Sequence, residues 1–185
     1  DSGGIVICKD KSSLDREAAK AKLRASLKRD YSKIAREWAY QNVPRRIIAE
    51  KYISELGNDD LLDYKMYSFH GEPKLTVVCS DRFSKTGTRM NFYDINWEPM
   101  GIHFGHYPPL STEFPKPATY EEMKRLTAEL SKDCPFLRVD FYEIKGRLYI
   151  GELTFFPGAG LEQFCPMTKD YELGEWLHLE NVHRG

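Results

Sequence analysis

Two strand-like runs that flank a short polar turn place the tightest constraint on the fold of this chain. The runs cover residues 138–144 and 148–154, and residues 145–147 between them are Lys, Gly and Arg. Apolar and polar residues that alternate on both sides of a glycine-containing turn are typical of an antiparallel hairpin. Each run carries one acidic residue, Asp140 or Glu152, where a half-buried hairpin would ordinarily carry an apolar one.

The register of this hairpin decides whether the two acids meet. With residues 145–147 as a three-residue turn, counting outward along both strands pairs Asp140 with Glu152. Thr154 then lies on the same face, two positions further along the second strand. A two-residue turn of Lys and Gly would break this register and place the two acids on opposite faces.

Two carboxylates that face each other repel, so this pairing is unfavourable without a cation. A bound Mg²⁺ reverses the sign, because it takes a few oxygen ligands from protein and the rest from water and phosphate. Asp140 and Glu152 are therefore candidate magnesium ligands. The alternative is a pair of edge carboxylates that point to solvent, one of them paired with Arg138.

Composition limits the class of protein. Of the 185 residues, 30% are charged and 41% hydrophobic, as in soluble globular proteins, and the formal net charge of −1 argues against nucleic-acid binding through bulk positive charge. No apolar run is long enough to cross a bilayer and no signal-like segment opens the chain. Widely spaced cysteines indicate reduced thiols, so we expect a cytoplasmic protein; they are Cys8, Cys79, Cys134 and Cys165.

The remaining pattern mixes helices and hairpins. Strands are predicted at 5–8, 47–53, 63–69, 74–79 and 91–97, and helices after a cap at Ser12 or Ser13, at 32–40 and after a capping box at 119–122. Residues 98–117 are rich in Pro and Gly and are predicted to form a long surface loop. This order predicts an α+β fold with antiparallel sheets, divided into a small unit of residues 1–46 and a larger unit of residues 47–185.

Several basic and glycine residues could meet phosphate. Period-two alternation places Asp63 and Lys65 on one face of a strand, and an inward lysine is costly to bury unless it meets an anion. Arg82 lies beside a polar turn, and each of these cations could instead be solvated at the surface. Gly3 and Gly4 precede an apolar run, which suits a loop whose backbone N–H groups bind phosphate, although no P-loop or dinucleotide-binding pattern is present.

Taken together, these stretches resemble the ATP-grasp superfamily, and most closely its TupA-like branch, which is associated with teichuronopeptide and other surface-polysaccharide synthesis. The resemblance covers essentially the whole chain and is carried by SGGIVICKDKSSLD, IIAEKYI, LLDYKMYSFHGEPK and RVDFYEIKGRLYIGELTFFPGAG. It implies two α+β lobes with ATP between them, the small lobe truncated at its N-terminus.

The resemblance also implies roles for individual residues. Asp140, Glu152 and Thr154 would coordinate Mg²⁺, and Lys65 and Arg82 would be catalytic cations near the phosphates or the acyl phosphate. The family usually carries Asn where this chain has Thr154, so a water-bridged contact is the alternative for that residue. The implied nucleotide-binding set comprises the phosphate loop, the end of the first strand, the adenine hinge and the ribose and phosphate contacts: Ser2, Gly3, Gly4, Lys9, Glu50, Lys51, Tyr52, Ile53, Asp63 and Lys65.

The implied activity is an ATP-dependent carboxylate–amine ligase. Its partners would be ATP, Mg²⁺, and carboxylate and amine substrates that are small molecules or linked to glycans. The alternatives are a glycosyltransferase or a kinase of the same pathway, or a non-catalytic remnant that binds ATP. In the family a phosphate-binding lysine and a substrate-holding domain would precede Asp1, so we expect a fragment that is inactive by itself.

Overall fold

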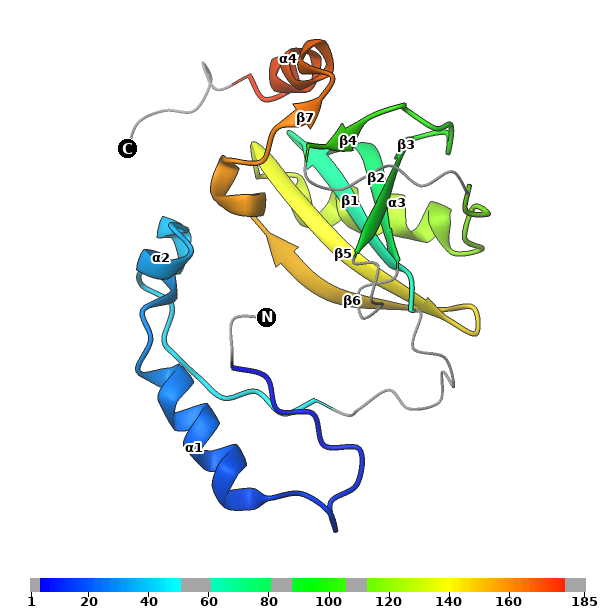
Figure 1. Ribbon diagram of the computed structural model, residues 1–185. Coiled ribbons are helices and arrows are strands. Elements are labelled where there is room, and N and C mark those ends of the chain that lie inside the picture. Colours follow the sequence, from blue (N-terminus) through cyan, green and yellow to red (C-terminus); the bar gives the residue numbers. More distant parts are fainter. Residues whose placement is uncertain (1–3, 51–60, 81–87, 106–112, 179–185) are drawn as a thin grey trace. The chain divides into compact units, whose positions relative to one another are not determined.

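The computed structural model describes residues 4–50, 61–80, 88–105 and 113–178. The chain separates into two compact units, Asp1–Gly57 and Asn58–Gly185, which are described one at a time (Figure 1). The predicted division at residues 46 and 47 lies inside the first unit, and the assignment of the two units to two lobes stays a prediction. No helix in the described residues is both long and apolar enough to span a membrane.

The described part of the first unit contains helices but no strand. These are α1 (Arg16–Leu27), the short helix α2 (Tyr31–Ile34) and the 3₁₀ turn η1 (Trp38–Tyr40). The continuous helix predicted over 32–40 is wrong, because Arg36 adopts a left-handed conformation with φ of 59° and separates α2 from η1.

The N-terminal cap of α1 differs from the prediction. Asp15 is the cap, and its side chain accepts a hydrogen bond of 2.9 Å from the backbone N–H of Ala18. Ser12 instead donates from its backbone N–H and its hydroxyl to the Asp10 carboxylate, at 2.9 and 2.6 Å. The two serines belong to a turn before the helix, which begins later than predicted.

The prediction of strands at 5–8 and 47–53 is also wrong for those of their residues that the structure describes. Residues 4–8 and 47–50 have no regular secondary structure, and residues 51–53 lie outside the described part. Ile5 and Ile7 are 57% and 60% exposed. A strand must pair its backbone groups with a neighbouring strand, and the described part of this unit offers none.

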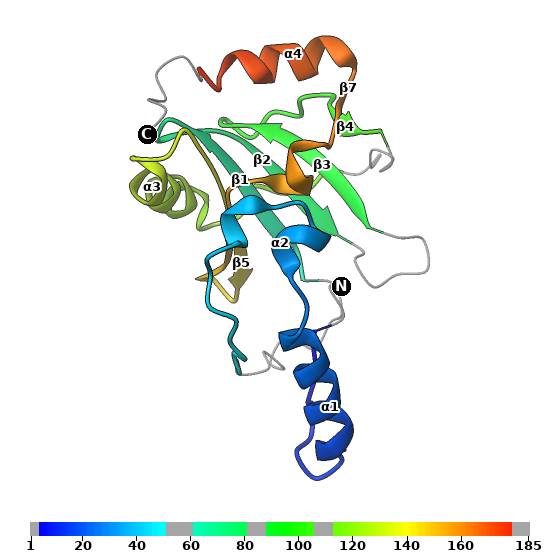
Figure 2. The ribbon, with the colours of Figure 1, turned by 90° about the vertical axis from the view of Figure 1, so that its left-hand side faces the viewer.

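The second unit is built on a five-stranded sheet in which every neighbouring pair is antiparallel. Its spatial order is β3 (Arg89–Asp94), β2 (Glu72–Ser80), β1 (Asp63–Phe69), β5 (Phe136–Ile144) and β6 (Arg147–Thr154). Two helices, α3 (Tyr120–Ser131) and α4 (Met167–Glu175), accompany it (Figure 2). The expected α+β fold with antiparallel sheets is confirmed, including both predicted hairpins.

The predicted surface loop at 98–117 contributes to the core. Within it, β4 (His103–Phe104) pairs with β7 (Phe164–Cys165) in a second, two-stranded sheet. Ile102 and Phe104 are each only 3% exposed, so this part of the prediction is wrong. Residues 106–112 of the segment lie outside the described part.

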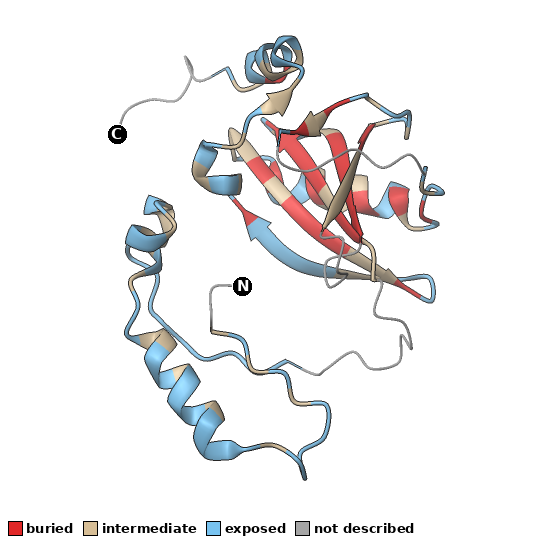
Figure 3. Cartoon of the chain, in the orientation of Figure 1, coloured by how far each residue is buried: buried red, intermediate tan, exposed pale blue. Residues whose placement is uncertain are grey.

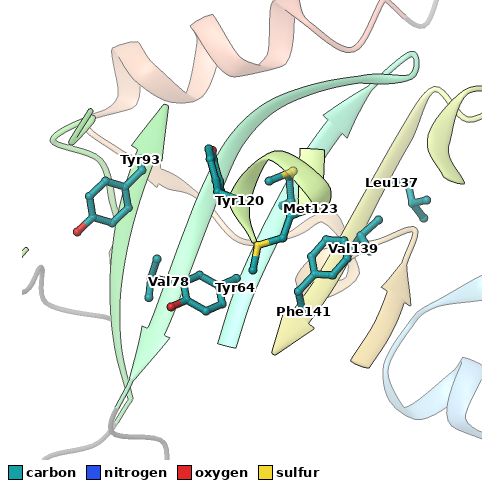
Figure 4. Packing of buried hydrophobic residues seen from close by; sticks show 9 residues of the cluster. Tyr64, Val78, Tyr93, Tyr120, Met123, Leu137, Val139 and Phe141 are labelled. Atoms are coloured by element: carbon teal, nitrogen blue, oxygen red, sulfur yellow. The ribbon is translucent and has the colours of Figure 1, made fainter. Parts of the chain in front are cut away.

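The two faces of the main sheet bury different apolar clusters. The central strands β1, β2 and β5 are rich in buried residues, whereas β6 is largely exposed (Figure 3). Alternate residues of β1 and β5, such as Tyr64 and Phe141, pack against Tyr120 and Met123 of α3 (Figure 4). On the opposite face, side chains of β1, β2 and β3 pack against β4 and α4; the buried members are Tyr67, Phe69, Leu75, Val77, Cys79, Phe92, Ile102, Phe104 and Leu173. On this second face, the apolar cluster does not include residues from the part of β1, β5 and β6 that carries Asp63, Asp140 and Glu152.

The start of α3 is held by a strand rather than by its own capping box. The backbone N–H and the hydroxyl of Thr119 both donate to one oxygen of Glu143 on β5, at 2.8 and 2.6 Å. The Thr119 side chain therefore makes no hydrogen bond to the helix backbone, and the predicted local cap is wrong. A carboxylate at a helix N-terminus is favourable because it faces the positive end of the helix dipole.

Candidate active site

The turn between β5 and β6 has two residues, not the three predicted. Ile144 pairs directly with Arg147, and Lys145 and Gly146 both have positive φ, of 51° and 73°. Two consecutive positive φ values are those of a type I′ turn, whose twist matches the twist of a hairpin. By itself this turn would place Asp140 and Glu152 on opposite faces.

A β-bulge restores the predicted pairing. The register shifts between Asp140 and Phe141, so that Phe141 pairs with Ile150 while Asp140 pairs with Glu152, and Gly151 is the additional residue. The two acids therefore do lie opposite each other on one face. The turn and the bulge are two departures from the predicted register, and their effects on the pairing of the acids cancel.

Replacing Gly151 by valine is expected to destabilise this hairpin. An added Cβ would lie 2.6 Å from ring carbon Cε2 of Tyr142, so the ring must move or the bulge must be lost. We expect a loss of about 1–2 kcal/mol in the free energy of unfolding, measured by urea denaturation. Gly174→Ala, at a site in α4 with nothing within 4 Å of the added Cβ, is the control and is expected to be neutral or stabilising. Equal stability of the Gly151 variant and the wild type would contradict this account of the bulge.

Strand β1 brings two more charged side chains to the same face. Lys65 is the cross-strand partner of Asp140, and Asp63 lies two residues before it on β1. Because side chains alternate along a strand, Asp63 and Lys65 share a face, as the alternation predicted. Asp140 lies on the same face because it is the cross-strand partner of Lys65. We call the group Asp63, Lys65, Arg138, Asp140, Glu152 and Thr154 the polar cluster.

Lys65 bridges two buried carboxylates. Its ammonium lies 2.8 Å from Asp63 Oδ2 and also donates to Asp140 Oδ2. Burial opposes the charge on this ammonium, but Asp140 and Asp63 outweigh the burial, and the pKa of Lys65 is raised. The lysine is therefore a fixed positive charge inside the sheet.

Arg138 holds the other side of Asp140. Its Nε donates to Asp140 Oδ1 at 2.6 Å and its Nη2 donates to Oδ2 at 2.8 Å, a bidentate pair. Nη2 also donates to Thr154 Oγ1 at 2.9 Å and lies 3.5 Å from Glu152 Oε2. Burial opposes the charge, yet Asp140 outweighs it and raises the pKa of the guanidinium. All three predicted metal ligands thus converge on one nitrogen atom.

Arg138 is the member of the polar cluster for which the sequence predicts no functional role, only a possible pairing with one hairpin acid. Its position two residues before Asp140 on the same strand was the signal that could have found it, since residues i and i+2 share a face.

The exposure of the acidic side chains in the polar cluster increases from β1 and β5 to the edge strand β6. The side chains of Asp63 and Asp140 are 1% and 3% exposed, whereas that of Glu152 on the edge strand β6 is 57% exposed. On the other side the cluster meets the apolar core at Tyr67, where burial raises the pKa of the phenol. Solvent therefore reaches the cluster from the Glu152 side.

The donor set fits magnesium shared with a phosphate ligand. No three His, Cys, Asp or Glu residues of the described part form a group that could hold a metal by themselves. Two carboxylates, Asp140 and Glu152, and the Thr154 hydroxyl nevertheless lie within reach of one point. Magnesium is commonly held by one or two carboxylates, with water and phosphate oxygens completing its coordination.

Fixed cations beside adjacent carboxylates suit the binding and neutralisation of a polyphosphate rather than attack by a side-chain nucleophile. The cluster contains three carboxylates and two cations, so it carries a net negative charge that a divalent cation would offset.

The other predicted site residues lie in the first unit or outside the described residues. Gly4, Lys9 and Glu50 belong to the first unit and lie outside its helices. The remaining ones lie outside the described residues, namely Ser2, Gly3, Lys51, Tyr52, Ile53 and Arg82. Their roles stay predictions.

Comparison with known proteins gives one result. The family model described as TupA-like ATPgrasp matches residues 1–178 of the 185-residue chain. No curated protein and no solved structure matched. Because the family model covers nearly the whole sequence, including both hairpins and the polar cluster, the chain belongs to the TupA-like ATP-grasp family.

Proposed function

We propose that this chain binds ATP and a metal ion as a carboxylate–amine ligase that acts in the cytoplasm on precursors of cell-surface polysaccharides. Membership of the ATP-grasp family gives the general function, that of an ATP-dependent, ligase-like enzyme. The carboxylate and amine substrates, the pathway and the cellular location are parts of the proposal.

The observation that carries the proposal is the convergence of Asp140, Glu152 and Thr154 next to two partly buried cations on one sheet face. Asp140 and Glu152 would hold Mg²⁺, with Thr154 as a third oxygen, directly or through water. When bound, the metal would neutralise charge on the ATP phosphates. Lys65 would add fixed positive charge to the same position.

The reaction needs positioning and charge neutralisation more than side-chain chemistry. A carboxylate oxygen of the substrate would take the γ-phosphoryl group of ATP, which gives an acyl phosphate and ADP. The amine nitrogen would then attack the acyl carbon, phosphate would leave with the C–O bonding electrons, and the nitrogen would lose one proton. Fixed positive charge stabilises the charge that moves in both steps, and in the polar cluster Lys65 would supply it.

A carboxylate that contacts the ribose of ATP would be open to the ligand, whereas Asp63 is buried and paired with a lysine. Its Oδ2 is engaged with the Lys65 ammonium at 2.8 Å, and its side chain is buried. We therefore propose that Asp63 positions Lys65, in addition to any contact with ATP. The phosphate loop at residues 2–4, Lys9, the adenine hinge at residues 50–53 and the catalytic role of Arg82 remain proposals from the family.

A test of this function is titration calorimetry with a non-hydrolysable ATP analogue, with and without Mg²⁺. We expect Mg²⁺ to tighten binding to the wild type, and Asp140→Asn/Glu152→Gln to weaken Mg²⁺-dependent binding by at least about tenfold. The control is Glu72→Gln/Asp133→Asn, which makes the same chemical changes at exposed positions outside the cluster and is expected to bind like the wild type.

Equal binding by the wild type and the Asp140→Asn/Glu152→Gln variant would show that the metal assignment is wrong. A kinase, a glycosyltransferase and a non-catalytic ATP-binding protein are the alternatives for the reaction. ADP release that requires both an acid and an amine distinguishes the ligase from all three.

A further inference from the structure

We propose that Arg138 is an internal cation that occupies the metal position of the metal-free protein and must leave it when a metal binds. The proposal deepens the proposed function, because it rests on Asp140 and Glu152 being the metal ligands. It makes Arg138 a competitor of the metal for the same position.

The geometry around Arg138 Nη2 is the first support. This nitrogen lies 2.8 Å from Asp140 Oδ2, 2.9 Å from Thr154 Oγ1 and 3.5 Å from Glu152 Oε2. A divalent ion that bridged the same three oxygen groups would need the volume that this NH₂ group fills. The guanidinium and the metal therefore exclude each other from that point.

The charges supply the second support. Asp140 and Glu152 are direct cross-strand partners, and like charges in that arrangement destabilise a sheet unless a cation lies between them. In this structure the cation is the Arg138 guanidinium, whose planar fork matches a carboxylate. The bulge at Gly151, which makes the two acids face each other, is thus compatible with a metal-free sheet.

Lys65 makes the exchange feasible. Asp140 is buried, and losing every cationic partner would leave a buried unpaired charge, which is costly. The Lys65 ammonium contacts Asp140 Oδ2 from β1, on the side away from β6. Asp140 therefore keeps one cation when the guanidinium departs, and a released Arg138 stays attached to β5 at the edge of the site.

Binding of Mn²⁺ alone, followed by electron paramagnetic resonance of the free ion, tests this competition without turnover or nucleotide. We expect Arg138→Met to bind Mn²⁺ at least about tenfold more tightly than the wild type, because the competing charge is gone. Mn²⁺ should also raise the melting temperature of this variant by more than it raises that of the wild type. The matched control is Arg147→Met, an exposed arginine on the same hairpin, which should bind Mn²⁺ like the wild type.

Equal or weaker Mn²⁺ binding by Arg138→Met overturns the inference, and so does the absence of Mn²⁺ binding in both proteins. If Arg138→Met does not fold, Arg138→Gln, which keeps a hydrogen-bond donor without the charge, is titrated with the same expected direction. Failure here is distinct from failure of the proposed function. The latter is decided by nucleotide binding to Asp140→Asn/Glu152→Gln, whatever Arg138 does.

Discussion

Replacing Lys65 by methionine is expected to lower the free energy of unfolding by about 3–5 kcal/mol, because it removes one partner from a buried ionic network. The variant leaves Asp63 and Asp140, with side chains 1% and 3% exposed, without the ammonium that bridges them. Methionine fills a similar volume, so the loss would report on charge rather than on a cavity. Urea denaturation monitored by circular dichroism measures it.

A double-mutant cycle gives this prediction its control. Lys65→Met/Asp63→Asn removes one negative charge together with the positive one and should recover part of the stability lost in Lys65→Met. Lys74→Met, on the neighbouring strand, breaks a surface pair with Glu72 and should cost no more than about 1 kcal/mol. A loss of less than 1 kcal/mol in Lys65→Met, or no recovery in the double variant, would contradict the view of Lys65 as the essential counter-ion.

The polar cluster could be predicted in part because alternation along a strand is a strong local signal. The spacing of Asp63 and Lys65 places them on one face, and the structure bears this out, because the Lys65 ammonium lies 2.8 Å from the Asp63 carboxylate. Lys65 also pairs with Asp140 on β5. The contact itself joins residues 75 positions apart. Only the order of the strands, which brings β1 next to β5, decides it, and no local pattern encodes that order.

The pairing of Asp140 with Glu152 was predicted correctly but for an incomplete reason. The turn shape follows from Lys145 and Gly146, and a lysine with positive φ is uncommon enough to be missed. Gly151 inside a strand was an available signal of a bulge. Side-chain period two makes a hairpin register sensitive to each single residue, so two unrecognised one-residue features can cancel.

The predictions failed where a segment depends on partners that the local sequence does not contain. The apolar run around Ile5 and Ile7 reads as a buried strand, yet its described residues have no strand beside them. At α3 a capping box was present in the sequence, but the Glu143 carboxylate from β5 binds Thr119 instead. In both cases tertiary contacts, or their absence, override a local preference.

The second large effect is expected from Phe141→Ala, on the face of the sheet opposite the polar cluster. Phe141 is fully buried against α3, and its truncation should cost about 3–5 kcal/mol in the free energy of unfolding. Ile150, its cross-strand partner on the edge strand, is 49% exposed, and Ile150→Ala should cost about 1 kcal/mol or less. Urea denaturation of both variants gives the comparison, and similar losses would contradict the assignment of the core.

The same variant separates stability from ligand binding. Asp140 precedes Phe141 directly in β5, but alternation places their side chains on opposite faces, so Phe141→Ala removes packing without removing any charge of the polar cluster. Under conditions in which the variant is folded, its Mn²⁺ affinity should stay within about threefold of the wild-type value, whereas Arg138→Met should change it by at least about tenfold. A large loss of metal affinity in Phe141→Ala would mean that the position of Asp140 depends on the core below it more than on Lys65 and Arg138.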